Sequence, residues 1–210
     1  IEASNTFALG LLRELRALDP DSPNTFLSPL SASMALGMTL NGAAGDTRTQ
    51  MRDVLGFEGL EEDAINAAYG SLIELLLTLD PAVEVGLGNA IWTNGIPLRP
   101  TFTERVGTHF RAEIASLDFD DPAALDVMNG WVDSVTNGRI EKLLDRIPPG
   151  AVAYLINAIY FLADWSQPFD EGRTAPAPFT RTDGSRVTVR MMESEIGYRT
   201  LNAGSPGAVQ

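Results

Sequence analysis

A long apolar segment, residues 151–165, constrains the fold more than any other part of the chain. It reads AVAYLINAIYFLADW, carries no charge before Asp164 and is rich in β-branched and aromatic residues. Such a segment, with PPG just before it, predicts a long strand buried on both faces of a sheet. Asn157 lies in its middle, and burying an amide without partners costs about 1–3 kcal/mol. We therefore expect Asn157 to have a specific partner inside the protein.

The rest of the chain contains some segments with helical periodicity and others with strand periodicity. Helices come mostly first and strands mostly later, which favours an α+β fold. Helical periodicity or helix-boundary residues predict helices at 4–18, 28–43, 46–57, 61–79, 100–110 and 120–138. Strands are expected at 24–29, 83–95, 112–119 and 151–165, and a hairpin at 177–192 with its turn at Asp183-Gly184.

Two of these helices have features that are used later in assigning function. Ser28 suits the N-cap and Pro29 the first position of a helix that is apolar nearly all round, so this helix should be buried in the core. The helix at 61–79 is amphipathic and contains no Lys or Arg. Its expected inward face consists of Ile65, Ala68, Leu72, Leu76 and Leu79.

Composition excludes several classes of function. The formal net charge of −13 argues against a nucleic-acid or anionic-membrane partner. The absence of cysteine excludes disulfides and thiol chemistry. The longest uncharged run, Asn24 to Gly45, could span a bilayer by length, but Pro29 and its many hydroxyl and glycine residues favour a buried helix instead.

Little in the sequence points to catalysis, so no catalytic, metal or cofactor residue is assigned. A Ser-His-acid triad would need the single histidine, His109, which reads as a surface helix residue, and no Gly-x-Ser-x-Gly elbow accompanies it. The segment GLGNAI at 86–91 is an incomplete glycine fingerprint in which the strand simply continues. The acidic DFDD at 118–121 lies where a helix cap is needed, and we interpret it as that cap.

Four segments in order resemble one protein family, the serpins, or serine protease inhibitors. They are NTFLSPLSASMALGMTLNGAAGDTRTQMRDVLGF (24–57), VMNGWVDSVTNGRIEKLL (127–144), LINAIYFLADWSQPF (155–169) and FTRTDGSRVTVRMM (179–192). The resemblance implies the α+β serpin fold: helices A–F, the large sheet A and the start of sheets B and C. We expect residues 1–210 to form a single incomplete serpin domain, because the matching region of the family ends before its reactive-centre loop.

The resemblance also implies roles for particular residues. In the family, the position matching Asn157 lies beneath the centre of sheet A, in a region called the shutter, where it joins helix hydroxyls that here would be Ser28 and Ser31. Trp165 matches the breach, the strand end where the reactive loop first enters the sheet. The reactive bond itself is expected outside this chain. Since serpins need their C-terminal strands, we expect the isolated segment to lack a complete core and to show no cooperative thermal transition.

The function implied is inhibition of a serine endopeptidase by a suicide-substrate mechanism in a metastable fold. The alternative is a non-inhibitory serpin, acting as a carrier, chaperone or storage protein. An unrelated α+β enzyme with paired carboxylates would leave the ordered matches unexplained. We further expect a monomer without cofactor, metal, nucleic-acid, membrane or heparin site, with a target serine protease as partner. It is expected to be extracellular, with a leader not visible in the chain, and its Ala, Gly and Asp content leans towards a prokaryotic source.

Overall fold

The computed structural model describes residues 2–22, 24–78, 80–165 and 167–193 in two compact units, Ile1–Ala163 and Asp164–Gln210. In the first unit the elements are α1 (Glu2–Leu18), α2 (Pro29–Leu40), α3 (Gly45–Leu55), α4 (Glu62–Thr78), β1 (Val83–Asn94), α5 (Pro100–Phe110), β2 (Ala112–Leu117), α6 (Ala123–Val135) and β3 (Ala153–Ala163). The second unit contains the short 3-10 helix η1 (Glu171–Arg173) and the strands β4 (Ala175–Thr180) and β5 (Arg186–Met191). The α+β prediction is confirmed.

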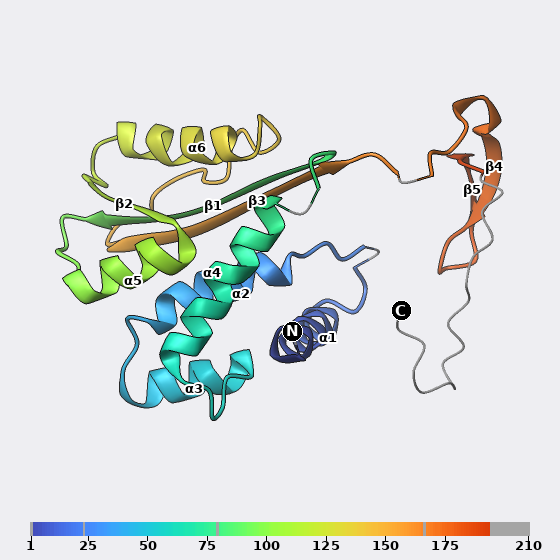
Figure 1. Ribbon diagram of the computed structural model, residues 1–210. Helices are drawn as coiled ribbons and strands as arrows, with labels where there is room; N and C mark the ends of the chain where they lie inside the picture. The colour runs from blue at the N-terminus through green and yellow to red at the C-terminus, as the bar shows by residue number, and fades with distance from the viewer. Residues whose placement is uncertain (1, 23, 79, 166, 194–210) are drawn as a thin grey trace. The chain divides into compact units, whose positions relative to one another are not determined.

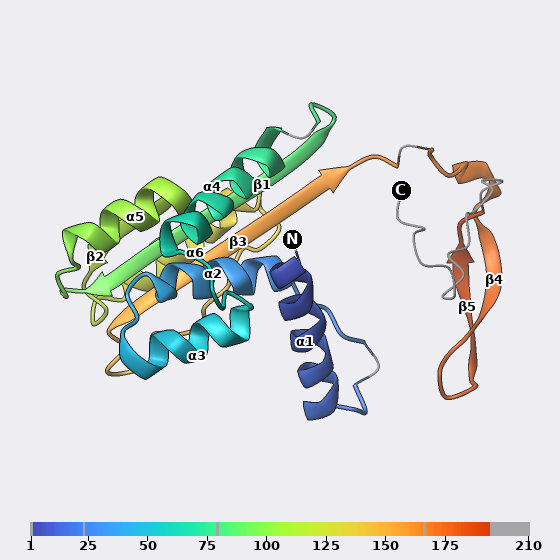
Figure 2. The ribbon, with the colours of Figure 1, turned by 60° about the horizontal axis from the view of Figure 1, so that its bottom comes forward.

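The first unit is built around a three-stranded sheet in the order β2-β1-β3. Strand β1 pairs in parallel with β2 and antiparallel with β3, and Asn89 lies directly opposite Asn157. Helix α6 covers one face of the sheet, and α2 and α4 cover the other (Figure 1). In the turned view, α2 passes across β3 while α5 runs beside β2 (Figure 2).

Helix α2 is the centre of the larger core, as its apolar composition predicts. Its Met34 and Met38 are fully buried between the sheet and the outer helices. Ser28 caps it by accepting a hydrogen bond from the Ser31 backbone N–H at 3.3 Å, and Pro29 occupies the first turn, where a missing N–H costs nothing. The predicted start of this helix is therefore confirmed.

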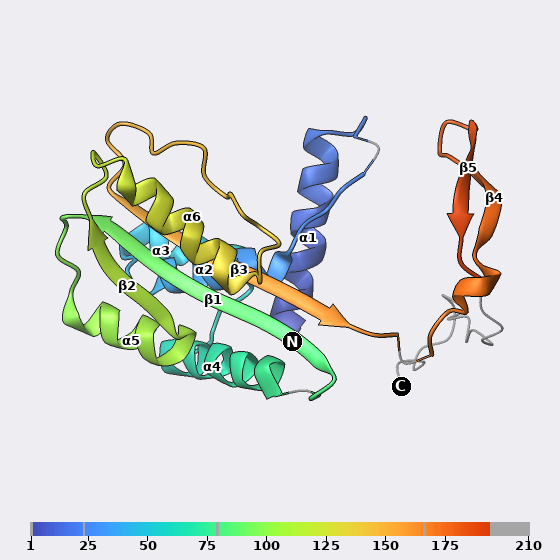
Figure 3. The same cartoon turned by 90° about the horizontal axis from the view of Figure 1, so that it is seen from above.

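Helix α6 packs directly on the backbone of β1, because two positions of that strand have no side chain. A Cβ on Gly88 would come within 2.9 Å of the Trp131 ring and of Val135 Cγ1, and one on Gly86 would collide with the Val135 carbonyl. Figure 3 shows α6 lying over β1 and β3. The ring of Trp131 meets Trp92 of β1 edge-on, with centroids 5.3 Å apart. The two glycines thus set how closely the helix approaches the sheet.

Three expectations from the sequence are corrected. Residues 24–28 form no strand, since the described residues hold no strand for them to pair with. Strand β3 is not buried on both faces: Phe161 is 67% exposed, because the described part of β3 has a neighbour on one side only. Helix α4 is rotated from its expected orientation, burying the set Ile65, Asn66, Tyr69 and Ile73 and leaving Ala68 exposed. Leu79 of the expected face lies outside the described residues.

The second unit contains the predicted hairpin. Strands β4 and β5 pair antiparallel, and the turn between them has Gly184 at a φ of 80°, a left-handed conformation that glycine adopts without strain. The carboxylate of Asp183 accepts a hydrogen bond from the Ser185 backbone N–H at 2.8 Å. Among the described residues, no helix has the length and apolar character needed to cross a bilayer.

Candidate functional site

Two asparagines face each other at the middle of the antiparallel pair formed by β1 and β3. Asn157 Nδ2 donates to Asn89 Oδ1 at 2.9 Å, and Asn89 Nδ2 donates to the Phe110 carbonyl at 2.7 Å. The same Asn157 nitrogen lies 3.4 Å from the Gly88 carbonyl and 3.5 Å from Met34 Sδ. Asn89 is 1% exposed. A chain of amides therefore connects β3, β1 and the end of α5. The partner expected for Asn157 is Asn89.

One atom of this pair stays unsatisfied. Asn157 Oδ1 is enclosed by the protein, yet it accepts no hydrogen bond from any of the described residues. A buried polar atom without a partner costs about 1–3 kcal/mol. Asn157 lies on β3, which pairs with β1 on one side and has no second partner strand among the described residues. The amide pair therefore keeps one unused hydrogen-bond acceptor inside the protein.

The hydroxyls expected to bond Asn157 do not do so. Ser28 Oγ donates to Ser31 Oγ at 3.1 Å and also accepts from the Ser31 backbone, so the two serines satisfy each other at the start of α2. The residue of α2 that reaches Asn157 is Met34, through its sulfur. The predicted contact between Ser28 or Ser31 and Asn157 is therefore absent from the described part of the chain, whereas their role as shutter residues stays a prediction.

A different hydroxyl of α2 joins the core. Ser33 is 5% exposed, and its Oγ lies 2.6 Å from Tyr69 Oη of α4, which also donates to the Ser33 carbonyl at 2.9 Å. Burial raises the pKa of Tyr69 above its ordinary value, although the hydrogen bond with Ser33 opposes that rise. This pair fixes α4 against α2 on the face of the sheet that Asn157 approaches.

The other residues considered for function take no part in the hydrogen bonds of this polar pair. Trp165 belongs to the second unit, where it is 65% exposed and its ring meets Phe169 edge-on with centroids 5.4 Å apart. His109 is a half-buried residue of α5. Asp121 Oδ1 accepts from the Ala123 backbone N–H at 2.9 Å, which confirms the capping interpretation of that acidic segment. No group of three or more His, Cys, Asp or Glu among the described residues is placed to hold a metal ion.

Sequence reasoning missed Asn89 as a member of the site. The signal was available, because Asn89 is an amide in the middle of an apolar strand, just as Asn157 is. It was read only as part of an incomplete glycine fingerprint. The pairing of the two residues depends on the register between strands that are 68 positions apart in the chain.

Comparison with known protein families gives one match over nearly the whole chain. The family described as "Serpin (serine protease inhibitor)" matches residues 2–205. Among curated relatives, the corticosteroid-binding globulin of Saimiri sciureus is 38% identical over 201 residues, which are 93% of this chain and 49% of that protein. Iripin-4 of Ixodes ricinus is 34% identical over 204 residues, covering 94% of this chain and 51% of that protein. The chain thus spans about half the length of these relatives.

Solved structures agree with this match. Cleaved kallistatin complexed with heparin superposes with a TM-score of 0.84 at 28% identity, covering 90% of this chain and 57% of that one. The native state of tengpin, a thermophilic serpin, gives a TM-score of 0.73 at 33% identity, covering 80% of this chain and 43% of that one. The prokaryotic source expected from composition stays a prediction.

Proposed function

Since this chain belongs to the serpin family, we propose that the whole protein inhibits a serine endopeptidase and acts as a suicide substrate. The family consists of protease inhibitors and carriers rather than enzymes. We further propose that both units described above are parts of one serpin domain, residues 1–210 being its N-terminal portion. The reactive-centre loop is expected outside this chain.

In the proposed mechanism, the serine of the target protease attacks the reactive bond in the loop. An acyl-enzyme forms and the new amino terminus leaves, so the loop is cut while it remains joined to the protease. The freed loop then adds to the sheet as a new strand, because its backbone groups find partners there. The attached protease is carried along and its active site is distorted, which stops hydrolysis of the acyl bond.

The single observation that supports this mechanism is the buried amide pair of Asn89 and Asn157, in which Asn157 Oδ1 accepts no hydrogen bond from the described residues. We propose that the sheet rearranges when a further strand is added and that a donor then comes within reach of this oxygen. The hydrogen bond gained would stabilise the added strand by about 1 kcal/mol. We propose that Asn157, with Asn89 as its partner, is a latch that responds to strand addition. We also propose that Ser28 and Ser31 belong to the shutter region, and that Trp165 belongs to the breach, as the matching family positions do.

A carrier function is the alternative, and a specific observation favours it. Several of the relatives are corticosteroid-binding globulins, with 34–38% identity over 90% or more of this chain. A carrier could keep the sheet and the Asn89–Asn157 pair as fold architecture without trapping a protease. Its ligand would bind reversibly, and the loop would be cut as an ordinary substrate.

Further proposals concern partners and location. We propose that the protein acts outside the cell as a monomer, without nucleic acid or membrane as partner. Helix α4 has no Lys or Arg, so we expect no heparin site on it, even though the kallistatin structure contains heparin. Heparin acceleration that charge changes in α4 abolish would contradict this expectation.

The experiment that tests the inhibitor proposal mixes the full-length protein with a panel of serine proteases and resolves the products on a denaturing gel. A band at the summed mass of protease and inhibitor is expected, because the acyl bond survives denaturation. Protease whose catalytic serine has been blocked beforehand is the control and should give no such band. Complete cleavage without a trapped complex across the panel would refute suicide inhibition and support the carrier alternative.

A further inference from the structure

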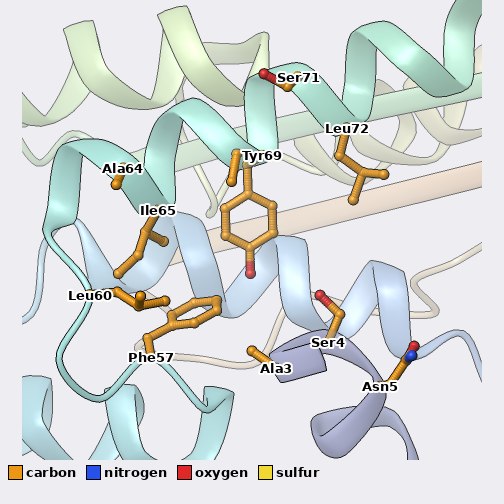
Figure 4. A pocket seen from close by; sticks show the side chains of 11 residues that line it. Ala3, Ser4, Asn5, Phe57, Leu60, Ala64, Ile65, Tyr69, Ser71 and Leu72 are labelled. Atoms are coloured by element: carbon orange, nitrogen blue, oxygen red, sulfur yellow. The ribbon is translucent and has the colours of Figure 1, made fainter. Parts of the chain in front are cut away.

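We propose that a pocket between α1 and α4 binds a neutral small molecule with a hydrocarbon body and a single hydroxyl or carbonyl group. The pocket has a volume of about 600 Å³, which is within the range of small-molecule sites. One wall consists of Ala3, Ser4 and Asn5 of α1. The other consists of α4 and the turn before it, and Figure 4 shows Phe57, Leu60, Ile65 and Tyr69 on that side.

The wall formed by α4 is held in place by the core behind it. Tyr69 and Ile65 are 6% and 5% exposed, and the Tyr69 hydroxyl is engaged in its hydrogen bonds with Ser33 of α2. The Tyr69 ring also packs edge-on against Phe57, with centroids 6.1 Å apart, and against Phe110 at 4.8 Å. A ring fixed on three sides cannot rotate to fill the space.

The wall formed by α1 is held by contacts with the core and with the end of α3. Phe7 is 8% exposed and anchors α1 in the core that contains α2 and α3. Gly56, the residue that ends α3, lets Ala3 approach so closely that a Cβ on the glycine would lie 3.3 Å from the Ala3 Cβ. Phe7 belongs to the same core cluster as Ile65 and Tyr69, so one core holds both walls of the pocket.

The chemistry of the lining selects the ligand class. No ionisable carboxylate, amine or guanidinium lines the pocket, so a charged group would be desolvated without compensation. Anions are disfavoured further by the acidic residues at the start of α4 and by the net charge of −13. The polar groups are the side chains of Ser4, Asn5 and Ser71, none of which has a hydrogen-bond partner among the described residues. They suffice for one hydroxyl or carbonyl.

These same features disfavour a peptide as the occupant. An extended segment brings one backbone donor and one acceptor per residue, and each must be satisfied when it is buried. The apolar wall formed by Phe57, Leu60 and Ile65 offers no such partners. A hydrocarbon body satisfies that wall without leaving polar groups unpaired, which is why we commit to a small apolar molecule.

The test uses Nile red, a neutral apolar dye with a carbonyl group, titrated into the full-length protein and followed by fluorescence. Saturable binding is expected. Ala68→Phe places a ring in the pocket and should weaken binding at least tenfold, because Ala68 lines it. The matched control is Ala67→Phe, an exposed neighbour on the same helix that does not line the pocket, and it should change the affinity less than twofold.

A second pair of variants and a competition measurement test the same pocket. If Ala68→Phe unfolds the protein, Asn5→Trp fills the pocket from the exposed α1 wall, with Thr6→Trp as its control. Displacement of the dye by 1-dodecanol should be at least tenfold more effective than displacement by dodecanoate. Absence of saturable binding, equal affinities in filling and control variants, or equal displacement by the two competitors would overturn the proposal. Protease trapping should be unaffected in the variants that fill the pocket. Dye binding therefore tests this pocket, and the trapping gel tests the proposed function separately.

Discussion

Replacing Asn157 with alanine tests whether the amide pair between β3 and β1 is the energetic centre of the site. The substitution removes the donor at 2.9 Å from Asn89 Oδ1, and Asn89 is 1% exposed, so that oxygen would lose its hydrogen bond in a place water does not reach. The loss of a buried partner costs about 1–3 kcal/mol. The substitution also removes the unsatisfied Asn157 Oδ1, which offsets part of that cost. We therefore expect a net loss of about 1 kcal/mol.

The coupling between residues is more informative than the single substitution. Once Asn89→Ala has removed the acceptor, Asn157→Ala should cost less, giving an interaction free energy of about 1–2 kcal/mol in a double-mutant cycle. A second cycle pairs Asn157→Ala with Ser31→Ala. Because Ser31 bonds Ser28 and not Asn157, this cycle should be additive within about 0.5 kcal/mol.

The assay is urea unfolding of the full-length protein and its variants, analysed only where the slope of the free energy of unfolding with urea is unchanged. Additivity in the Asn89 cycle would refute the pairing described here. Strong coupling in the Ser31 cycle would show that the hydroxyls of α2, rather than Asn89, hold Asn157. The protease-trapping gel on the same variants then separates a change in inhibition from a change in stability.

Two further predictions follow from the packing. Gly88→Ala brings a Cβ within 2.9 Å of the Trp131 ring and should cost about 1–3 kcal/mol in urea unfolding, whereas Gly130→Ala on α6, where a Cβ meets nothing within 4 Å, should be neutral or stabilising; equal effects would contradict the close contact. Burial raises the pKa of Tyr69 despite the Ser33 hydrogen bond, so the native state retains this proton more strongly than the unfolded state. This contribution to the free energy of unfolding is complete below about pH 10 and is lost as pH rises through the raised pKa. Tyr69→Phe should therefore reduce the loss of stability at alkaline pH. An unchanged dependence of the free energy of unfolding on pH would disprove this.

Local patterns were sufficient to predict most of the elements. The N-cap at Ser28, the glycine turn at Gly184 and the helix at 100–110 depend on residues close together in the chain, so their signals are present in short windows of sequence. The order of the family-like segments then indicated the fold. These are the features for which propensity and packing agree.

Contacts between distant segments could not be predicted in this way. Helix α4 turns Tyr69 and Ile73 inward because α2 and α5 leave room for them, and periodicity alone favoured a face containing Ala68. The partner of Asn157 depends on the register of two strands, which a single sequence does not specify. The pocket beside α4 lies along the expected face, because Ile65, Ala68 and Leu72 of that face line it.

The two bare positions of β1 have a consequence for how the sheet can be observed in motion. Strand β1 has no side chain at Gly86 or Gly88 to shield its backbone, so the cover over that stretch is α6 itself. Amide hydrogens of this part of β1 should then exchange with solvent deuterium only when α6 has moved away and the pairing with β3 has opened. Helix α6 forms none of the sheet's hydrogen bonds, yet it would contribute to the protection of these amides. Their exchange rate would then report on movement of α6 away from this face of the sheet.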